Sequence, residues 1–143
     1  MTYEAFETIK VAVDGALAIV TVAREAALNA LSSQVISELT AASGELEVST
    51  DVRVVILTGA GEKAFVAGAD IAEMRDLSPL QAQAFAEMGG TLAHSIETSE
   101  KPWIAAVSSA ITFEDSALSA ASRATVTVAS APSTATWMVS NVS

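Results

Sequence analysis

The chain has 143 residues, of which 51% are hydrophobic and 17% charged, and its formal net charge at pH 7 is -10. This length fits one domain with an adequate core. The 7 basic residues against 17 acidic ones argue against a nucleic-acid partner, because binding to a phosphate backbone draws its affinity from clustered Lys and Arg. We expect the acidity to serve solubility.

The sequence lacks several signals that would place it in other classes. No apolar run reaches the roughly 18 residues that cross a bilayer, and the start, MTYEAFETIK, lacks the basic-then-apolar order of a secretory signal. The chain has no cysteine and a single histidine, His94, so we expect neither disulfides nor a metal site. The sequence therefore predicts a cytoplasmic protein with no membrane partner and no metal.

The first predicted elements are strands and one helix. Apolar and small residues alternate over residues 9–22 on both sides of Asp14-Gly15, which predicts a β-hairpin with a type I′ turn. Apolar positions recur at helical spacing over residues 33–47, which predicts an amphipathic helix packed on a sheet. The β-branched run over residues 52–59 predicts a central strand, covered on both faces and parallel to its neighbours.

The next predicted elements are two helices and a strand. Asp70 with Glu73 three residues later forms a capping-box pattern, which predicts the start of a short helix. Ser78 before Pro79 predicts a second helix start, whose apolar face comprises Leu80, Phe85, Met88, Leu92 and Ile96. A buried strand is predicted over residues 103–107. Strands that alternate with helices in this order predict an α/β domain with right-handed crossovers.

Beyond Val107 the sequence becomes rich in Ser, Thr and Ala. A helix is predicted over about residues 114–124 and a strand over residues 125–129. The last fourteen residues, 130–143, contain Pro132 and are weakly patterned, which fits an edge segment or a frayed tail. We therefore expect one α/β domain over residues 1–129 and a separate C-terminal tail over residues 130–143.

The stretch VAGADIAEM, residues 66–74, is the main candidate for a functional site. Small residues that lead into a helix N-terminus present backbone N–H groups without partners, and such groups bind anions or developing oxyanions. The candidate donors are the amides of Ala69, Asp70 and Ile71. The alternative is a tight connection between a strand and a helix, in which the glycine only relieves steric crowding.

Several segments together resemble a known family. EKAFVAGADIAEM, preceded by DVRVVILTGAG and followed by KPWIAAV, is similar to the N-terminal half of the crotonase superfamily, specifically its enoyl-CoA hydratases. ALNALSSQVISEL, residues 27–39, resembles the family's first helix and the loop before it. The likeness covers about residues 9–107. It implies a crotonase-like ββα superhelix fragment with a mainly parallel sheet flanked by helices, and a homo-oligomer.

The resemblance also implies a ligand and site residues. In the family, the position of Ala69 donates a backbone hydrogen bond to the thioester oxygen of an acyl-CoA, which stabilises an enolate-like intermediate. The likeness thus implies an acyl-CoA thioester as ligand and no covalently bound cofactor. Residues that would line the CoA path are Ala67, Gly68, Asp70 and Ile71, with Ala27 and Leu28 covering the cofactor from the other side.

After Val107 the sequence departs from the family pattern. A glycine triplet that supplies the second N–H donor in the family falls here on Phe113, Glu114 and Asp115, and the first catalytic glutamate falls on Ala117. No Asp or Glu follows Asp115, so the second catalytic carboxylate is also absent. These departures predict an acyl-CoA-binding domain that lacks hydratase activity.

Two alternatives remain open at this level. One is a non-catalytic structural or designed oligomerisation module that uses the same scaffold. The other is an active enzyme that takes a carboxylate from elsewhere, with Glu73 or Glu114 as the base.

Overall fold

The computed structural model describes residues 6–107 and 125–128. The described elements, in chain order, are β1 (Ile9–Asp14), β2 (Leu17–Val22), the short 3-10 helix η1 (Glu25–Ala27), α1 (Ser33–Val48), β3 (Val54–Gly59), α2 (Ile71–Met74), α3 (Pro79–Glu97), β4 (Trp103–Val107) and β5 (Thr125–Val128).

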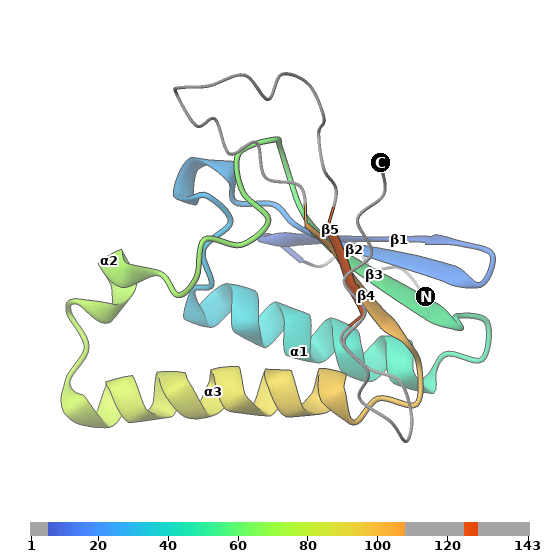
Figure 1. The fold of residues 1–143 in the computed structure, drawn as a ribbon. Coiled ribbons are helices and arrows are strands. Elements are labelled where there is room, and N and C mark those ends of the chain that lie inside the picture. The colour runs from blue at the N-terminus through green and yellow to red at the C-terminus, as the bar shows by residue number, and fades with distance from the viewer. Residues whose placement is uncertain (1–5, 108–124, 129–143) are drawn as a thin grey trace.

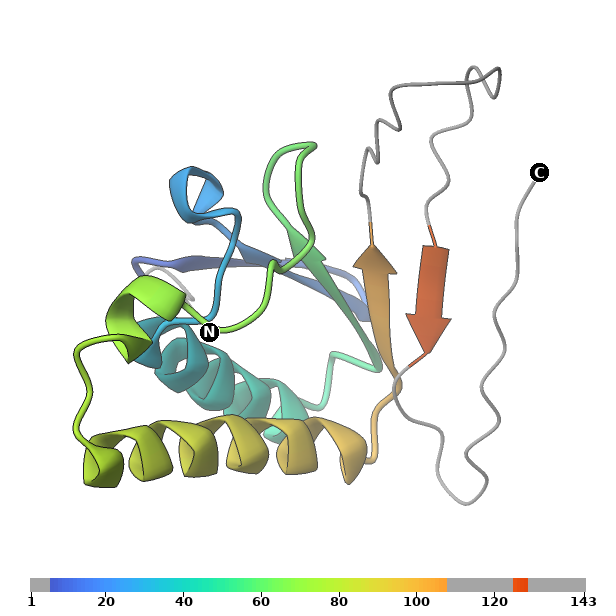
Figure 2. The ribbon, with the colours of Figure 1, turned by 60° about the vertical axis from the view of Figure 1, so that its left-hand side comes forward.

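The five strands form one sheet in the order β1-β2-β3-β4-β5. β2, β3 and β4 are parallel, whereas β1 and β5 run antiparallel to their neighbours. Figures 1 and 2 show α1 and α3 side by side on one side of this sheet. The predicted α/β class is therefore confirmed, with the parallel strands at the centre and an antiparallel strand at each edge.

The predicted hairpin is confirmed, but its turn differs from the prediction. Asp14 pairs with Leu17, so Gly15 and Ala16 are the two central residues of the turn. Gly15 has a φ of +56°, whereas Ala16 has no positive φ. A type I′ turn requires a positive φ at both central residues. The type I′ prediction centred on Asp14-Gly15 is therefore wrong, because the turn lies one residue later and only its first position is left-handed.

The core lies between the sheet and α1. Six residues of α1 are buried, against two in α3, because α1 lies between the sheet and α3 (Figure 1). From α3, Phe85 and Leu92 are buried, but Leu80 is 77% exposed. The step from Leu80 to Phe85 is five residues, which turns a helix to a position about 140° away. The prediction that Leu80 belongs to the apolar face of α3 is therefore wrong.

The central strand β3 is less covered than predicted. Val55 and Gly59 are buried, and the other residues of β3 are only partly buried. No described helix covers the side of the sheet opposite α1 (Figures 1 and 2). The prediction that this strand is covered on both faces is therefore not met by the described residues.

Side chains fix the ends of the two long helices. Ser78 and Gln81 form a capping box at the start of α3, which confirms the predicted helix start. At the C-terminal end of α1, the ammonium group of Lys101 donates to the carbonyl oxygens of Leu46 and Ser49. Together with the Ser49 N–H, which also donates to the Leu46 carbonyl, it supplies partners for carbonyl groups at the end of the helix.

The C-terminal predictions are only partly covered by the described residues. The predicted strand over residues 125–129 is found as β5, paired with β4. The predicted helix over residues 114–124 and the predicted tail over residues 130–143 lie outside the described residues. None of the described helices is both long enough and apolar enough to cross a membrane.

Candidate functional site

Two segments leave the sheet side by side at the carboxyl ends of its parallel strands. Val22 at the end of β2 pairs with Gly59 at the end of β3, so residues 23–32 and 60–70 begin next to each other, as Figure 2 shows. We call them the 23–32 segment and the 60–70 segment. Ligand sites in open α/β sheets gather at the carboxyl ends of parallel strands, and the predicted site residues of the described chain lie on these segments or directly after them.

Asn29 joins the two segments from a buried position. Its side chain is 1% exposed and its backbone has a φ of +56°. The Asn29 Oδ1 atom accepts from the Arg24 N–H at 2.9 Å, and its Nδ2 atom donates to the carbonyl oxygens of Ala60 and Ala64, both at 2.8 Å. Asn29 was not among the predicted site residues. A polar amide within the apolar run AALNAL was the available signal, because a buried amide needs partners and Asn tolerates left-handed backbone.

Gly59 allows the 60–70 segment to fold back onto the end of β3. A Cβ atom at Gly59 would lie 2.1 Å from the Phe65 carbonyl oxygen, 2.7 Å from that of Ala64 and 2.8 Å from Asn29 Nδ2. No side chain fits such contacts. The glycine that ends β3 therefore makes the contact between the two segments possible.

A parallel bridge between Leu31 and Ala69 aligns the segments. Leu31 N–H donates to the Gly68 carbonyl at 2.8 Å, and Asp70 N–H donates to the Leu31 carbonyl at 2.9 Å. The prediction that Asp70 offers a free amide donor is therefore wrong, because a residue distant in sequence supplies its acceptor.

In this bridge the N–H of Ala69 points away from Leu31. In a parallel ladder, the groups of one residue bond to the two neighbours of its partner, so the partner's own N–H points away. Among the described residues, no hydrogen-bond acceptor is found for the N–H of Ala69 or Ile71. Ala67, Gly68 and Ala69 are all exposed. Two of the three candidate donors are thus accessible to a ligand.

Asp70 links the bridge to α2 and to Arg24. Its Oδ1 atom accepts from the N–H groups of Ala72 at 3.1 Å and Glu73 at 3.3 Å, which caps α2. Its Oδ2 atom accepts from Arg24 Nη2 at 3.0 Å. The hydrogen bond from Arg24, together with those from the backbone, holds the pKa of Asp70 below its ordinary value. The carboxylate is therefore charged at neutral pH and committed to structure.

Glu73 does not complete the predicted capping box. Its Oε2 atom accepts from Ser33 N–H at 3.0 Å, and its Oε1 atom accepts from the Ser33 hydroxyl. The Asp70 N–H, which a capping box would require, already donates to Leu31. Glu73 therefore satisfies the first amide of α1 and ties α2 to the start of that helix.

Apolar side chains flank the exposed amides. Leu28 is 45% exposed, Ile71 80% and Met74 40%, whereas Ala27 is half-buried. The Ala67 N–H donates to the Leu28 carbonyl at 3.1 Å, which brings the predicted Ala27-Leu28 pair next to the predicted stretch over residues 67–71. Glu114, the other predicted catalytic residue, lies outside the described residues.

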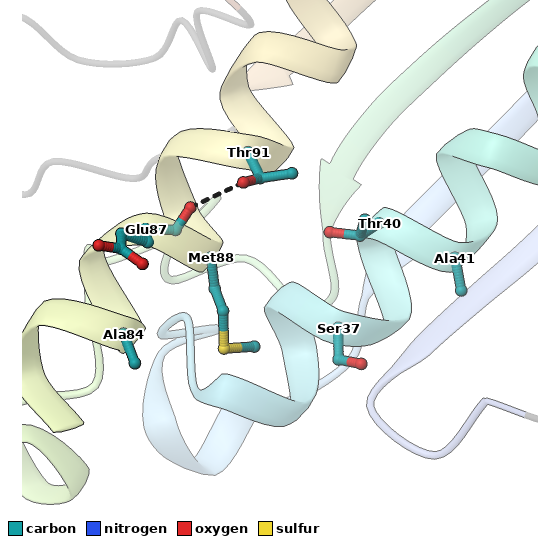
Figure 3. A pocket seen from close by; sticks show the side chains of 7 residues that line it. All are labelled: Ser37, Thr40, Ala41, Ala84, Glu87, Met88 and Thr91. Atoms are coloured by element: carbon teal, nitrogen blue, oxygen red, sulfur yellow. Dashed lines mark hydrogen bonds between the residues drawn. The ribbon is translucent and has the colours of Figure 1, made fainter.

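A separate groove runs between α1 and α3 (Figure 3). Met88 points from α3 toward α1, and the hydroxyl of Thr91 donates to the Glu87 carbonyl at 2.9 Å. None of the predicted site residues lines this groove, which is lined by Ser37, Thr40, Ala41, Ala84, Glu87, Met88 and Thr91. Over residues 6–107 and 125–128, no group of three or more His, Cys, Asp or Glu side chains is placed to hold a metal ion.

Comparisons with known proteins find one family. The family model described as Enoyl-CoA hydratase/isomerase matches residues 12–112. The short-chain-enoyl-CoA hydratase of Clostridium acetobutylicum is 47% identical over 94 residues, which cover 66% of this chain and 36% of that protein. The crotonyl-CoA hydratase of Syntrophomonas wolfei is 40% identical over 103 residues, which cover 72% of this chain and 40% of that protein.

A solved structure agrees with these relatives. The enoyl-CoA hydratase from Bacillus anthracis matches with a TM-score of 0.69 and 34% identity, over 71% of this chain and 40% of that chain. The present chain therefore spans less than half the length of these proteins. The family model covers most of the chain, and the resemblance seen over residues 9–107 is confirmed: the chain belongs to the enoyl-CoA hydratase/isomerase family of the crotonase superfamily.

Proposed function

We propose that this chain binds an acyl-CoA thioester at the 23–32 and 60–70 segments, and that the Ala69 N–H donates a hydrogen bond to the thioester oxygen. One observation carries the proposal: Ala69 is an exposed residue whose N–H points away from its bridge partner and has no acceptor among the described residues. The named relatives support the ligand class, because crotonyl-CoA hydratase is named for a CoA thioester.

The surroundings of Ala69 suit this ligand. The side chains of Ala67 and Ala69 are small, so a thioester can approach the backbone closely. Exposed Leu28, Ile71 and Met74 offer apolar contacts to the uncharged parts of an acyl-CoA. A backbone donor aimed at a developing oxyanion is worth about 2.7 to 4 kcal/mol in a transition state, and a neutral hydrogen bond about 0.5 to 1.5 kcal/mol in a ground state.

The proposal includes an absence of hydratase activity by the family's two-glutamate route. Glu114 and Asp115 stand where the resemblance places the glycines of the second donor, and two carboxylates there would oppose a developing enolate. Ala117 stands at the position of the first catalytic glutamate, and the sequence from Ser116 to Ser143 contains no Asp or Glu. The function proposed is therefore binding, with one oxyanion donor.

A titration of the full chain, labelled with nitrogen-15, tests the binding. Butyryl-CoA supplies the thioester, and S-butyl-CoA, the thioether without the carbonyl oxygen, is the matched control. We expect both ligands to shift the amide signals of residues 67–71, and butyryl-CoA alone to move the Ala69 signal downfield. The amide signal of Gly44, an exposed residue on α1, serves as a reference that stays unchanged. The absence of any shift at millimolar butyryl-CoA would contradict the proposal.

A further inference from the structure

We propose that Arg24 is a positioning residue for the Ala69 N–H: it holds the bridge between Leu31 and Ala69 in register and so keeps that N–H turned toward the thioester oxygen. The inference rests on the proposed function. It assigns to Arg24 no contact with the ligand, and makes the orientation of the donor depend on a side chain from the neighbouring segment.

The guanidinium group of Arg24 donates hydrogen bonds to both segments that the bridge joins. Its Nη1 atom donates to the Ala30 carbonyl at 2.8 Å, and its Nη2 atom donates to Asp70 Oδ2 at 3.0 Å. Ala30 directly precedes Leu31, and Asp70 directly follows Ala69. The group is planar and its donors have a fixed geometry, so it sets the spacing and the alignment of the two segments together.

Arg24 is itself held in place. Its N–H donates to Asn29 Oδ1, and its carbonyl oxygen accepts from the N–H groups of Ala27 and Asn29, both at 2.9 Å. Its side chain is 26% exposed and that of Asp70 is 14% exposed. Partly buried charges are screened less than exposed ones, so the ion pair adds a persistent restraint.

The bridge comprises two backbone hydrogen bonds, between Leu31 and the residues on either side of Ala69. Apart from the ion pair, the other hydrogen bonds between the two segments, from the Ala67 N–H and from the Asn29 side chain, all reach the 60–70 segment before Gly68. Gly68, next to Ala69, has a φ of +116°, a conformation that glycine adopts freely, so the local chain does not fix its own course. A slip of one residue turns every group to the opposite side, and the Ala69 N–H would then face the 23–32 segment instead of a ligand.

Replacement of Arg24 by Lys tests this role in the full chain. Lysine keeps the charge, but its single ammonium group does not reproduce the planar fork. The quantity measured is the preference for butyryl-CoA over S-butyl-CoA, the ratio of their dissociation constants. We expect a preference of about threefold to tenfold in the unaltered protein, the value of one hydrogen bond. Arg24→Lys should reduce it to near one, with the Kd for S-butyl-CoA changed less than about twofold.

Two further variants sharpen the result. Arg53→Lys makes the same substitution at an exposed arginine and should keep the full preference. Asp70→Asn keeps an oxygen for capping α2 and removes the second acceptor of Arg24, so it should also abolish the preference. In the double variant the two effects should not add, because both break the same contact. Should Arg24→Lys fail to fold, Asp70→Asn decides the question.

The outcomes separate this inference from the proposed function. A full preference in folded Arg24→Lys or Asp70→Asn overturns the inference alone. An equal loss of affinity for both ligands also overturns it, because a purely structural role would weaken both. No preference in the unaltered protein contradicts the proposed function, and the inference falls with it.

Discussion

At the scale of single residues, Asn29 shows why the site needs this particular side chain. Its position requires one acceptor, for the Arg24 N–H, and two donors, for the Ala60 and Ala64 carbonyls. A carboxamide carries both on one planar group, whereas a carboxylate has no donor. The backbone also has a positive φ, which Asn accepts at lower cost than most residues.

Replacement of Asn29 by Ala should therefore lower the free energy of unfolding by about 2 to 4 kcal/mol, because three partly buried backbone groups lose their partner and a left-handed conformation is kept without Asn. Urea unfolding followed by circular dichroism measures the change. The matched control is Gln34→Ala, which removes an exposed carboxamide and should cost less than about 0.5 kcal/mol. Equal effects of the two substitutions would show that Asn29 does not hold the segments together.

The sequence was informative about Ala69 but not about Asp70. A run of small residues before a helix start predicts unpaired amides from local chemistry alone, and no acceptor is found for the Ala69 N–H among the described residues, whereas its role as an oxyanion donor stays a prediction. The Asp70 N–H looked equivalent in sequence, yet Leu31 supplies its acceptor. Such a partner comes from the pairing of two segments in the fold, which no local pattern around Asp70 reveals.

At the scale of elements, α2 depends on its neighbours. A helix of 4 residues has no stability of its own, because nucleation fixes several residues for a single hydrogen bond. Asp70 caps its start, and Glu73 ties it to the first residue of α1 through the Ser33 N–H and hydroxyl. By positioning α2, these contacts also place the exposed Ile71 and Met74 next to the candidate site.

Replacement of Glu73 by Ala should release α2 and leave the rest of the fold intact. The N–H groups of Met74 and Arg75 donate to the backbone carbonyl oxygens of Asp70 and Ile71. They should exchange with deuterium about tenfold faster, since α2 then opens locally. Amides in the middle of α3 should exchange at their former rate. Glu87→Ala, at an exposed glutamate that bonds only within α3, is the control. Unchanged exchange in α2 would mean that the cap at Asp70 is sufficient by itself.

Most elements follow from periodicity and end signals. The hairpin, α1, the start of α3 and β4 were all predicted, because alternation, helical spacing and Ser-Pro starts are local features of the chain. The predictions fail where tertiary contacts decide. Leu80 is apolar, but its angular position on α3 lies away from the buried residues of that helix. Glu73 accepts from Ser33 on α1 instead of from the N–H of its own helix cap.

At the scale of the whole molecule, the two carboxylates that follow Ala69 most closely in the chain, those of Asp70 and Glu73, already accept hydrogen bonds. Asp70 binds Arg24 and the start of α2, and Glu73 binds Ser33. Both oxygens of Glu73 already accept hydrogen bonds from Ser33, which disfavours the alternative of Glu73 as the group that activates water. Homo-oligomeric assembly and a cytoplasmic location stay predictions, as does the division into residues 1–129 and 130–143.

The full chain should therefore bind crotonyl-CoA without hydrating it. Hydration needs one group to activate water and one to protonate the α-carbon, and the residues that the family resemblance puts in these places do not include two free carboxylates. Turnover is measured as the loss of enoyl absorbance. The protein concentration is the one at which the titration shows saturation with butyryl-CoA. We expect none above the rate without protein. Turnover that Glu114→Gln abolishes would instead establish Glu114 as the base, and turnover that survives this substitution would place the base elsewhere in the chain.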